Sequence, residues 1–341
     1  MAENSDEITN SEQTKKDIEL PFPGYTKWEK VKICFCFPGF HIPLIQTKFL
    51  GHWEIDIFLP ILVYLIIGTS YTIGMLKIIP TFGYHFRYFF LMGIFSILFI
   101  LFSYSYLRII VDGPGYLPFY GLDKKYFPLS RFQNSSNSED STPFLYLLKL
   151  NQLSCPFGLI STKKQLKWAK SRPRPNRCIV SGSGRRIIIR PDHHCCWTAS
   201  WIGRRNHKFF ILFNFWGCIY CSLFTILDFI ALIDIISRFK INLLFSLILY
   251  ITYLILGIFF SIFTGSFAVS HILNAASNIT SWEDWNNIDP KRFDKGNIWN
   301  NFEEIFGPKK KWWLWCLPVS PFKNISNAEL VSIYHYSYKD C

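Results

Sequence analysis

The sequence lacks an apolar segment at its start. Residues Met1 to Glu19 are polar and slightly acidic, with neither an apolar core nor a small-residue cleavage site. Nothing in this stretch resembles a removable signal peptide, so we expect the first long apolar run to direct insertion into a membrane.

The sequence also lacks a regular cysteine framework and an excess of acidic residues. Its ten cysteines are unevenly spaced, two of them inside an apolar run, which argues against an extracellular disulfide scaffold and indicates a reducing compartment with thiol chemistry. There are 24 Asp and Glu against 36 Lys and Arg, a formal net charge of +12. Because the basic residues crowd beside the apolar runs, we expect anionic lipid or an anionic ligand as partner and no nucleic acid.

Apolar residues, in contrast, are abundant. Half of the 341 residues are apolar and 18% are aromatic. They gather into four runs, Phe58 to Leu76, Tyr88 to Tyr106, Phe209 to Ile233 and Ile241 to Phe263. Each can cross a hydrocarbon core of about 30 Å as a helix of about 20 residues. The sequence therefore predicts an all-α polytopic membrane protein with four transmembrane helices and a cytosolic loop domain between helices 2 and 3.

The charge distribution predicts the orientation. Between Arg108 and Lys208 there are eighteen Lys or Arg and five Asp or Glu, so the large loop and both termini are expected in the cytosol. We expect a cytosolic N-terminal segment (1–54), transmembrane helices 1 and 2 (55–110), a cytosolic domain (111–208), transmembrane helices 3 and 4 (209–268) and a cytosolic C-terminal segment (269–341). We expect the membrane to be that of the endomembrane system or the plasma membrane.

The predicted spans lack the features of a transporter or channel. They carry no paired charges and no Gly- or Pro-broken segment near the middle of the membrane, where such proteins hold their ligands. Asp228 lies inside the third run, but at about 1.5 Å per residue it falls near the far interface, where water reaches it. A transport function is therefore disfavoured.

One segment combines a nucleophile with groups that activate it. Residues 190–210 read RPDHHCCWTASWIGRRNHKFF, in which Asp192, His193 and His194 directly precede Cys195. Neighbouring imidazole and guanidinium groups lower the pKa of a thiol, and a carboxylate beside an imidazole fixes its tautomer. Taken alone, the His and Cys residues also fit a metal site or a solvated loop. Together they supply a nucleophile, a base and an orienting residue.

This segment resembles the DHHC palmitoyltransferases, and the resemblance extends from the first span to about Gly307. Trp197, Gly203, Asn206 and Phe210 match the family's positions after the tetrapeptide. Four further segments resemble family motifs in the family's order: Asp112 to Pro118 (DGPGYLP, with one inserted Gly), Arg174 to Arg177 (RPNR), Thr280 to Glu283 (TSWE) and Asp294 to Gly307, with the motif's asparagine at Asn300.

The resemblance implies a protein S-acyltransferase. In the family, the cysteine matching Cys195 takes an acyl group from palmitoyl-CoA and passes it to a cysteine of a membrane-associated protein. His193 would be the base, Asp192 would orient it, and Arg174 and Arg177 would meet the anionic CoA head. Because each buried methylene contributes about 0.8 kcal/mol, we expect a tunnel among the spans that opens at Cys195.

The chain departs from the family at the zinc scaffold. Family members carry two tetrahedral zinc sites built from Cys and His, whereas neither residue type stands at the expected ligand positions, which are Lys167, Lys170, Val180, Ser181, Gly184, Ile187 and Trp201. Two such sites need eight ligands. We therefore expect no bound zinc, with apolar packing of Val180, Ile187, Ile188, Ile189 and Trp201 in its place, and we expect His194 to hydrogen-bond within the fold.

Other cysteines leave alternatives open. Cys196 stands where the family usually has proline; it could receive the acyl chain, resolve it or do nothing. Cys34, Cys36, Cys316 and Cys341 are either acylated themselves or ordinary thiols. The alternative function is a catalytically inactive membrane scaffold of the same fold, against which the intact Asp192, His193 and Cys195 argue.

Overall fold

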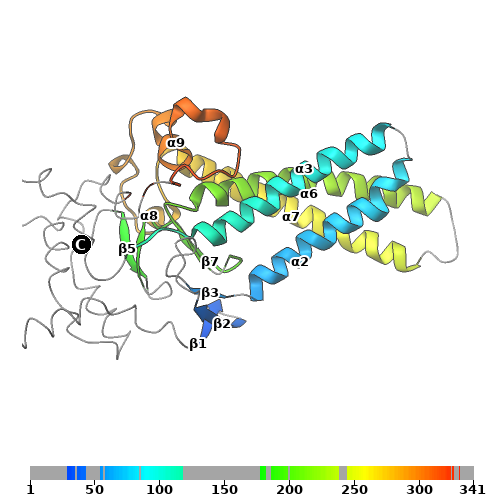
Figure 1. Ribbon diagram of the computed structural model, residues 1–341, viewed down its shortest axis with the longest axis horizontal. Helices are drawn as coiled ribbons and strands as arrows, with labels where there is room; N and C mark the ends of the chain where they lie inside the picture. Colours follow the sequence, from blue (N-terminus) through cyan, green and yellow to red (C-terminus); the bar gives the residue numbers. More distant parts are fainter. Residues whose placement is uncertain are drawn as a thin grey trace, which may run out of the picture.

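Four long helices form the body of the molecule. The computed structural model describes residues 29–34, 37–43, 54–56, 58–83, 86–117, 177–181, 186–198, 200–237, 244–323, 325 and 330. Helices α2 (Phe58–Ile73), α3 (Phe86–Asp112), α6 (His207–Ser237) and α7 (Leu244–Ala276) lie side by side along the long axis (Figure 1). Within the described residues, four helices are long and apolar enough to cross a membrane, which confirms the predicted fold class.

The first span changes helix type before it ends. The π-helix η1 (Gly74–Ile78) and the 3₁₀-helix η2 (Ile79–Phe82) continue α2 to its far end. Pro80 lies in this stretch; it lacks an N–H and cannot continue α-helical hydrogen bonding to the preceding turn. The segment Leu59–Phe82 is still long and apolar enough to cross a membrane as one unit.

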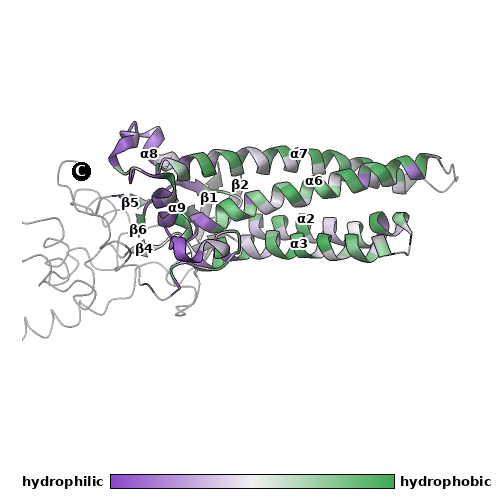
Figure 2. Ribbon diagram, turned by 90° about the horizontal axis from the view of Figure 1, so that it is seen from above, coloured by the Kyte–Doolittle hydropathy of each residue, from purple (hydrophilic) through white to green (hydrophobic). Residues whose placement is uncertain are grey.

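Aromatic side chains fill the space between the spans. The rings of Phe102 and Phe213 stack with centroids 4.9 Å apart, and those of Phe95 and Tyr220 with centroids 4.8 Å apart. Gly217 permits this approach of α3 and α6, since a Cβ there would lie 2.8 Å from the ring of Phe102. The outer faces of the helices are also apolar (Figure 2), as contact with lipid requires.

Helices α3 and α7 extend beyond their predicted C-terminal ends, toward the domain at one end of the bundle. α3 continues to Asp112, six residues past Tyr106, and α7 continues to Ala276, thirteen past Phe263. The added part of α7 contains Ser and His but no proline, so nothing in its backbone ends the helix. These extensions carry side chains out of the apolar layer and into the domain at one end of the bundle.

Short strands, which the sequence did not predict, build that domain. Strands β4 (Tyr116–Leu117), β6 (Arg186–Ile189) and β5 (Cys178–Ser181) form an antiparallel sheet in this order, and β7 (His193–Cys195) pairs with β8 (Ser200–Ile202). A third antiparallel sheet has the order β1 (Glu29–Cys34), β2 (Phe37–Pro43) and β3 (Glu54–Asp56).

The expected apolar packing in this domain is present in part. Ile188 and Ile189 are fully buried on β6, whereas Val180 and Trp201 are half-buried. The side chain of Ile187 lies outside the described residues, as do Lys167, Lys170 and Gly184.

The C-terminal segment folds back onto the ends of the spans. It contains α8 (Ser281–Trp285), η6 (Pro290–Arg292), α9 (Ile298–Phe306) and η7 (Lys309–Leu314). Asn301 Nδ2 donates to the carbonyl of Ala276 at 2.7 Å and so ties α9 to the end of α7. Asn301, and not the expected Asn300, holds the buried position.

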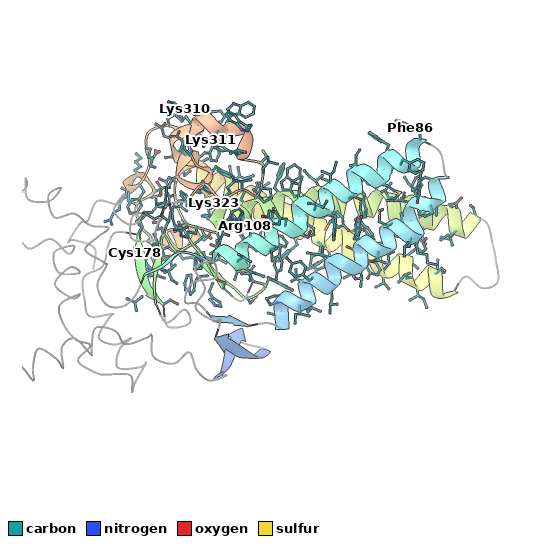
Figure 3. All side chains as sticks on the ribbon, in the orientation of Figure 1. Phe86, Arg108, Cys178, Lys310, Lys311 and Lys323 are labelled. Carbon is teal, nitrogen blue, oxygen red and sulfur yellow. The ribbon has the colours of Figure 1, made fainter. Side chains whose placement is uncertain are left out.

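Side chains at the ends of the spans fix the segment that follows α9. Lys208 Nζ donates to the carbonyls of Leu314 at 2.7 Å and Val319 at 2.9 Å, and Trp216 donates to that of Cys316 at 2.9 Å. Figure 3 shows Lys310 and Lys311 on the outside of this segment, at the end of the bundle opposite Phe86.

Candidate active site

A tight hairpin presents Cys195 at the end of the helix bundle. In β7 and β8, His193 pairs with Ile202 and Cys195 with Ser200. The turn after Cys195 is fixed to α3, because the Tyr106 hydroxyl donates to the carbonyl of Trp197 at 2.7 Å. Cys195 is buried, so its thiol meets protein groups rather than bulk water.

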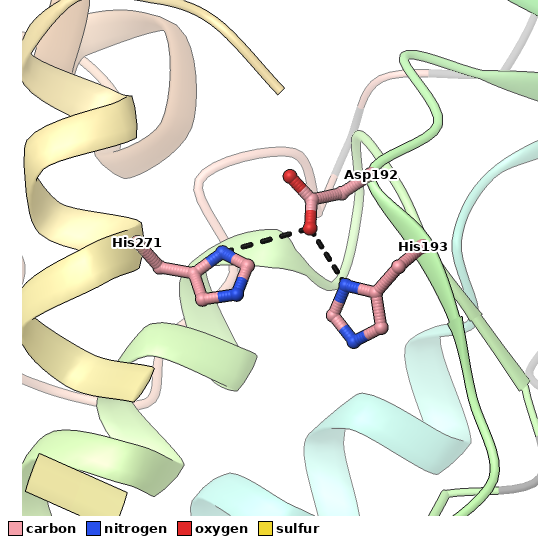
Figure 4. A group of neighbouring side chains, drawn as sticks. All are labelled: Asp192, His193 and His271. Atoms are coloured by element: carbon pink, nitrogen blue, oxygen red, sulfur yellow. Dashed lines mark hydrogen bonds and ion pairs between the residues drawn. The ribbon is translucent and has the colours of Figure 1, made fainter. Parts of the chain in front are cut away.

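His193 lies between the thiol and Asp192. Its Nδ1 is 2.7 Å from Asp192 Oδ2 (Figure 4). Burial would lower the pKa of His193, but its hydrogen bonds with Asp192 and Cys195 and their negative charges raise that pKa to about 10. The imidazole therefore carries a proton at neutral pH when the thiol is ionised.

The thiol is activated by this imidazole. Burial alone would raise the pKa of Cys195, but the hydrogen bond and positive charge of His193 outweigh it and lower the pKa below that of an ordinary thiol. A thiolate–imidazolium pair results, which is the reactive form of a catalytic cysteine.

Asp192 is fully buried and is held by the element after the fourth span. The Ser281 backbone N–H donates to Oδ1 at 3.0 Å and the Ser281 hydroxyl to Oδ2 at 3.2 Å. Burial would raise the pKa of Asp192, but the nearby imidazole of His207 and the hydrogen bond with His193 keep it well below its usual range. Asp192 is thus a carboxylate that accepts hydrogen bonds.

Sequence reasoning missed two histidines at this site. On α7, His271 Nδ1 lies 3.5 Å from Asp192 Oδ2; on α6, His207 Nε2 lies 3.7 Å from Asp192 Oδ1. Figure 4 shows Asp192 between the rings of His193 and His271. His271 lies eight residues beyond the predicted end of the fourth span, so no expected helix placed it. Its position ten residues before Ser281 was the available signal.

Asp192, His193 and His271 form the one group with metal-ligand spacing within the described part of the chain. The ligand atoms of Asp192, His193 and His271 all lie within 4.8 Å of one another. Asp192 Oδ2, however, already faces His193, His271 and the Ser281 hydroxyl. Hydrogen bonding within the protein accounts for the cluster, and we assign its members no metal.

An apolar cavity of about 260 Å³ begins at Cys195 and runs between the spans. Strand β7 and all four spans contribute to its wall. The lining residues are His193, His194, Cys195, Cys196, Trp197, Thr198, Val63, Ile66, Ile67, Ser70, Phe102, Phe210, Phe213, Asn214, Tyr220, Cys221, Phe224, Tyr253, Leu256, Gly257, Phe260, Phe263, Thr264 and Phe267. From Phe210 to Phe224 along α6 the lining covers about 21 Å at 1.5 Å per residue, a length that suits a long acyl chain.

Two polar side chains meet deep in this cavity. The hydroxyls of Ser70 on α2 and Tyr220 on α6 are 3.0 Å apart. Because the surrounding wall is apolar, this pair satisfies both hydroxyls and joins two spans across the cavity.

Arg177, which we expected to meet the CoA head, has a buried guanidinium. It makes a two-pronged contact with Glu283 at 2.6 and 2.7 Å and reaches Glu304 at 2.9 Å. Only 1% of its side chain is exposed. Arg174, its expected companion, lies outside the described residues.

Glu304 on α9 is the centre of a buried ion-pair cluster. It lies within 3.5 Å of Arg177, Arg190 and Arg204 and 2.8 Å from Lys295. Burial would raise the pKa of Glu304, but these cations hold it well below its usual range. The cluster joins β5 and the segments around β7 and β8 to the C-terminal elements, and so fixes the frame around Asp192.

The structure separates the remaining candidates. His194 is half-buried, with its ring edge-on to that of Trp201 at 5.8 Å, and Cys196 contributes to the cavity wall beside Cys195. Cys316 is exposed beside α6. Of the other predicted acylation candidates, Cys341 lies outside the described residues, as do Cys36 and the side chain of Cys34.

Known proteins resemble this chain over the region that forms the site. Residues 160–288 match the family model described as DHHC palmitoyltransferase. The Arabidopsis thaliana protein named "Probable protein S-acyltransferase 12" is 34% identical over 165 residues, which are 45% of this chain and 53% of the relative. "Palmitoyltransferase ZDHHC15A" of Danio rerio is 31% identical over 159 residues, 43% of this chain and 45% of the relative.

A longer match reaches further along the chain. "Probable protein S-acyltransferase 14" of Arabidopsis thaliana is 25% identical over 226 residues, which are 65% of this chain and 69% of the relative. The chain otherwise spans about half the length of the curated relatives that it matches. The family resemblance drawn from the motifs is confirmed.

Proposed function

Because the chain carries a domain of the DHHC palmitoyltransferase family at residues 160–288, we propose that it is a protein S-acyltransferase. It moves a long-chain acyl group from acyl-CoA to cysteines of membrane-associated proteins. One observation supports this above all: Cys195, hydrogen-bonded to His193, lies at the end of an apolar cavity lined by all four spans.

The first half-reaction loads Cys195. Its thiolate attacks the carbonyl carbon of the acyl-CoA thioester, a bond forms between that carbon and Sγ, and the bond to the CoA sulfur breaks. The leaving thiolate takes the proton of the His193 imidazolium, and Asp192 stabilises that cation until the proton moves. No energy source is needed beyond acyl-CoA, because one thioester replaces another.

The second half-reaction returns the site to its starting state. His193, now neutral, accepts the proton of the substrate thiol, whose sulfur attacks the acyl carbonyl and displaces Cys195 as thiolate. Between the two half-reactions the acyl chain occupies the cavity, where burial of each methylene contributes about 0.8 kcal/mol of binding free energy. A thiol already at the membrane surface meets the carbonyl in a suitable geometry.

The site faces the cytosol in this proposal, with both termini on the same side. The excess of Lys and Arg between Arg108 and Lys208 supports this orientation. Arg174 remains the residue proposed to meet the CoA phosphates. For Arg177 we instead propose a structural role, since its guanidinium is buried against Glu283 and Glu304.

Acyl-enzyme formation tests the function. Purified protein in detergent or nanodiscs is incubated with radiolabelled palmitoyl-CoA, and label on the chain is followed with and without hydroxylamine, which cleaves thioesters. We expect a hydroxylamine-sensitive label in the wild type and none in Cys195→Ser, with Cys316→Ser as the matched control. Label that persists in Cys195→Ser would refute the assigned nucleophile, and absence of label from the wild type would favour the scaffold.

A further inference from the structure

We propose that the C-terminal segment from Lys309 to Val319 is a lipid-binding surface. Its exposed apolar side chains enter the membrane interface, and Lys310 and Lys311 bind the anionic headgroups of phospholipids there. The segment consists of η7 (Lys309–Leu314) and the turn that follows it. This inference goes beyond acyl transfer, because it needs the spans to lie in a membrane but does not need the site to be active.

Hydrogen bonds hold this segment against the sides of the spans, close to the membrane surface. Trp216 Nε1 donates to the carbonyl of Cys316 at 2.9 Å, and Lys208 Nζ, at the start of α6, donates to two other carbonyls of the segment. Trp216 lies seven residues after Phe209, where the apolar run begins, which is about 10 Å along a helix. Cys316 therefore lies beside the outermost turns of the third span, at the depth where interfacial segments bind.

The segment packs on the protein through some side chains and exposes others. The ring of Trp315 lies 5.7 Å from that of Phe306 on α9, and Pro318 is buried. Four other large apolar side chains are exposed, namely Trp312, Trp313, Leu317 and Val319. The neighbouring spans are also apolar on their outer faces (Figure 2). Lipid is the occupant that suits this position, since tryptophan is enriched where hydrocarbon meets headgroups.

Two lysines give this surface its preference for negative charge. Lys309 Nζ donates to Asn300 Oδ1. Lys310 and Lys311 are exposed, and neither forms an ion pair within the residues that the structure describes. Both lie at the end of the bundle opposite Phe86 (Figure 3), where the headgroups of that leaflet would be. A lysine so placed strengthens the binding of anionic lipid about fivefold.

Fluorescence quenching by brominated lipid tests the proposal without acyl-CoA. The full-length protein is placed in nanodiscs of phosphatidylcholine in which a fixed fraction of the lipid has brominated acyl chains. The brominated lipid is either phosphatidylserine or phosphatidylcholine, and bromine quenches only indoles close to the acyl chains. The excess of quenching by phosphatidylserine over phosphatidylcholine measures how much anionic lipid gathers beside tryptophan.

We expect a clear excess in the wild type, since two tryptophans directly follow the two lysines. Lys310→Gln combined with Lys311→Gln should abolish the excess, and added salt should lower it in the wild type because salt screens exposed charges. Lys291→Gln combined with Arg292→Gln is the matched control. It removes the same charge from η6, where both residues are exposed, and should leave the excess unchanged.

A second variant, Trp312→Phe with Trp313→Phe, tests whether the segment reaches the lipid. It should reduce the fluorescence that either brominated lipid quenches, because it removes the two indoles that we place in the interface. Equal quenched fluorescence in the wild type and this variant would overturn the proposal, since the surface would then meet water or a protein partner.

The lysine variant decides the proposal even if the tryptophan variant does not fold. Absence of an excess in the wild type, or an excess that persists in the lysine variant, would overturn the binding of anionic lipid. None of these measurements depends on acyl-enzyme formation, so each outcome leaves the proposed function to be judged by its own test.

Discussion

At the scale of single residues, the chemistry depends on how Asp192 and His193 share charge with Cys195. The negative charge of Asp192 belongs to the set of interactions that raise the pKa of His193 to about 10. The imidazolium in turn lowers the pKa of Cys195. The thiol is ionised and its partner protonated over the same pH range, and that range ends where either group loses its charge.

Removing the charge of Asp192 should therefore narrow that range. In Asp192→Asn, the pKa of His193 falls back toward about 6.5, so above that pH the imidazolium is lost and the thiol regains an ordinary pKa. We expect acyl-enzyme formation at pH 7.5 to drop about a hundredfold or more, measured by rapid quench with labelled palmitoyl-CoA. Asp284→Asn, at an exposed position on α8, should behave as wild type. Equal rates in Asp192→Asn and wild type across pH 6 to 9 would contradict this account.

Tyr220 should set how long an acyl chain the cavity accepts. Its hydroxyl joins Ser70 across the cavity, so Tyr220→Ala removes a ring from the wall and opens the space behind it. We expect competition between acyl-CoAs of 16 and 20 carbons to shift toward the longer chain, measured by mass spectrometry of the Cys195 peptide. Tyr71→Ala removes a ring of the same size that does not line the cavity, and it should not change the preference. A shift of equal size in both variants would count against this assignment.

At the scale of elements, buried ion pairs join helix α9 to the segments next to β5, β7 and β8. Glu304 on α9 meets Arg177 before β5, Arg190 before β7 and Arg204 after β8. The loop that holds Cys195 and the segment after the fourth span are thereby fixed to each other. A buried ion cluster is sensitive to loss of one partner, since the charges left behind remain buried.

Glu304→Gln should destabilise the protein by about 3 kcal/mol or more, because three buried guanidiniums lose the carboxylate that they share, and of the three Arg177 keeps its contact with Glu283. Glu303, the neighbouring residue on the same helix, is half-buried. Glu303→Gln should lower the free energy of unfolding by well under about 3 kcal/mol. The measurement is the unfolding temperature in detergent. Equal decreases in the unfolding temperature of both variants would contradict the prediction that the ion-pair cluster stabilises the fold.

Acid should affect the same cluster. The pKa of Glu304 is lowered in the folded protein, so its contribution is present above its unfolded pKa, near 4.5, and is lost as pH falls through the folded pKa. Unfolding temperatures below pH 4.5 should therefore drop more steeply for the wild type than for Glu304→Gln.

At the scale of the whole molecule, four spans and the domain at one end form the proposed reaction site. The spans provide the cavity, the hairpin provides the thiol, and the C-terminal segment provides the donors that hold Asp192. Ion pairs and buried Ile188 and Ile189 support the strands. Because these contacts involve protein groups alone, we predict that the strands need no metal ion.

Removal of metal ions by a chelator should therefore leave the proposed acyl-enzyme formation unchanged. We expect elemental analysis of the purified protein to find well under one zinc per chain, and EDTA or phenanthroline to change neither the unfolding temperature nor acyl-enzyme formation. A family member that carries the zinc-binding cysteines serves as the positive control, since metal loss removes folding free energy from such domains. One or two tightly held zinc ions here would contradict the prediction.

The sequence by itself predicted the number of candidate spans, which the structure confirms, and it supplied Cys195 as the proposed nucleophile. Apolar length follows from bilayer thickness, and Cys195 stands among its activating groups within a few residues, so both signals are local. The short strands around it were not predicted, because each has only two to seven residues and their pairing, rather than their pattern, stabilises them.

Only the tertiary structure decided which distant residues complete the site. Arg177 and Glu283 are 106 positions apart, and Asp192 and Ser281 are 89 apart. The ion-pair partner of a charged side chain cannot be predicted from its position in the sequence, because that partner depends on which segments folding brings together. For that reason the sequence suggested an anion site at Arg177 and no role for His271. The structure places Arg177 against Glu304 on α9, and the extension of α7 places His271 near Asp192.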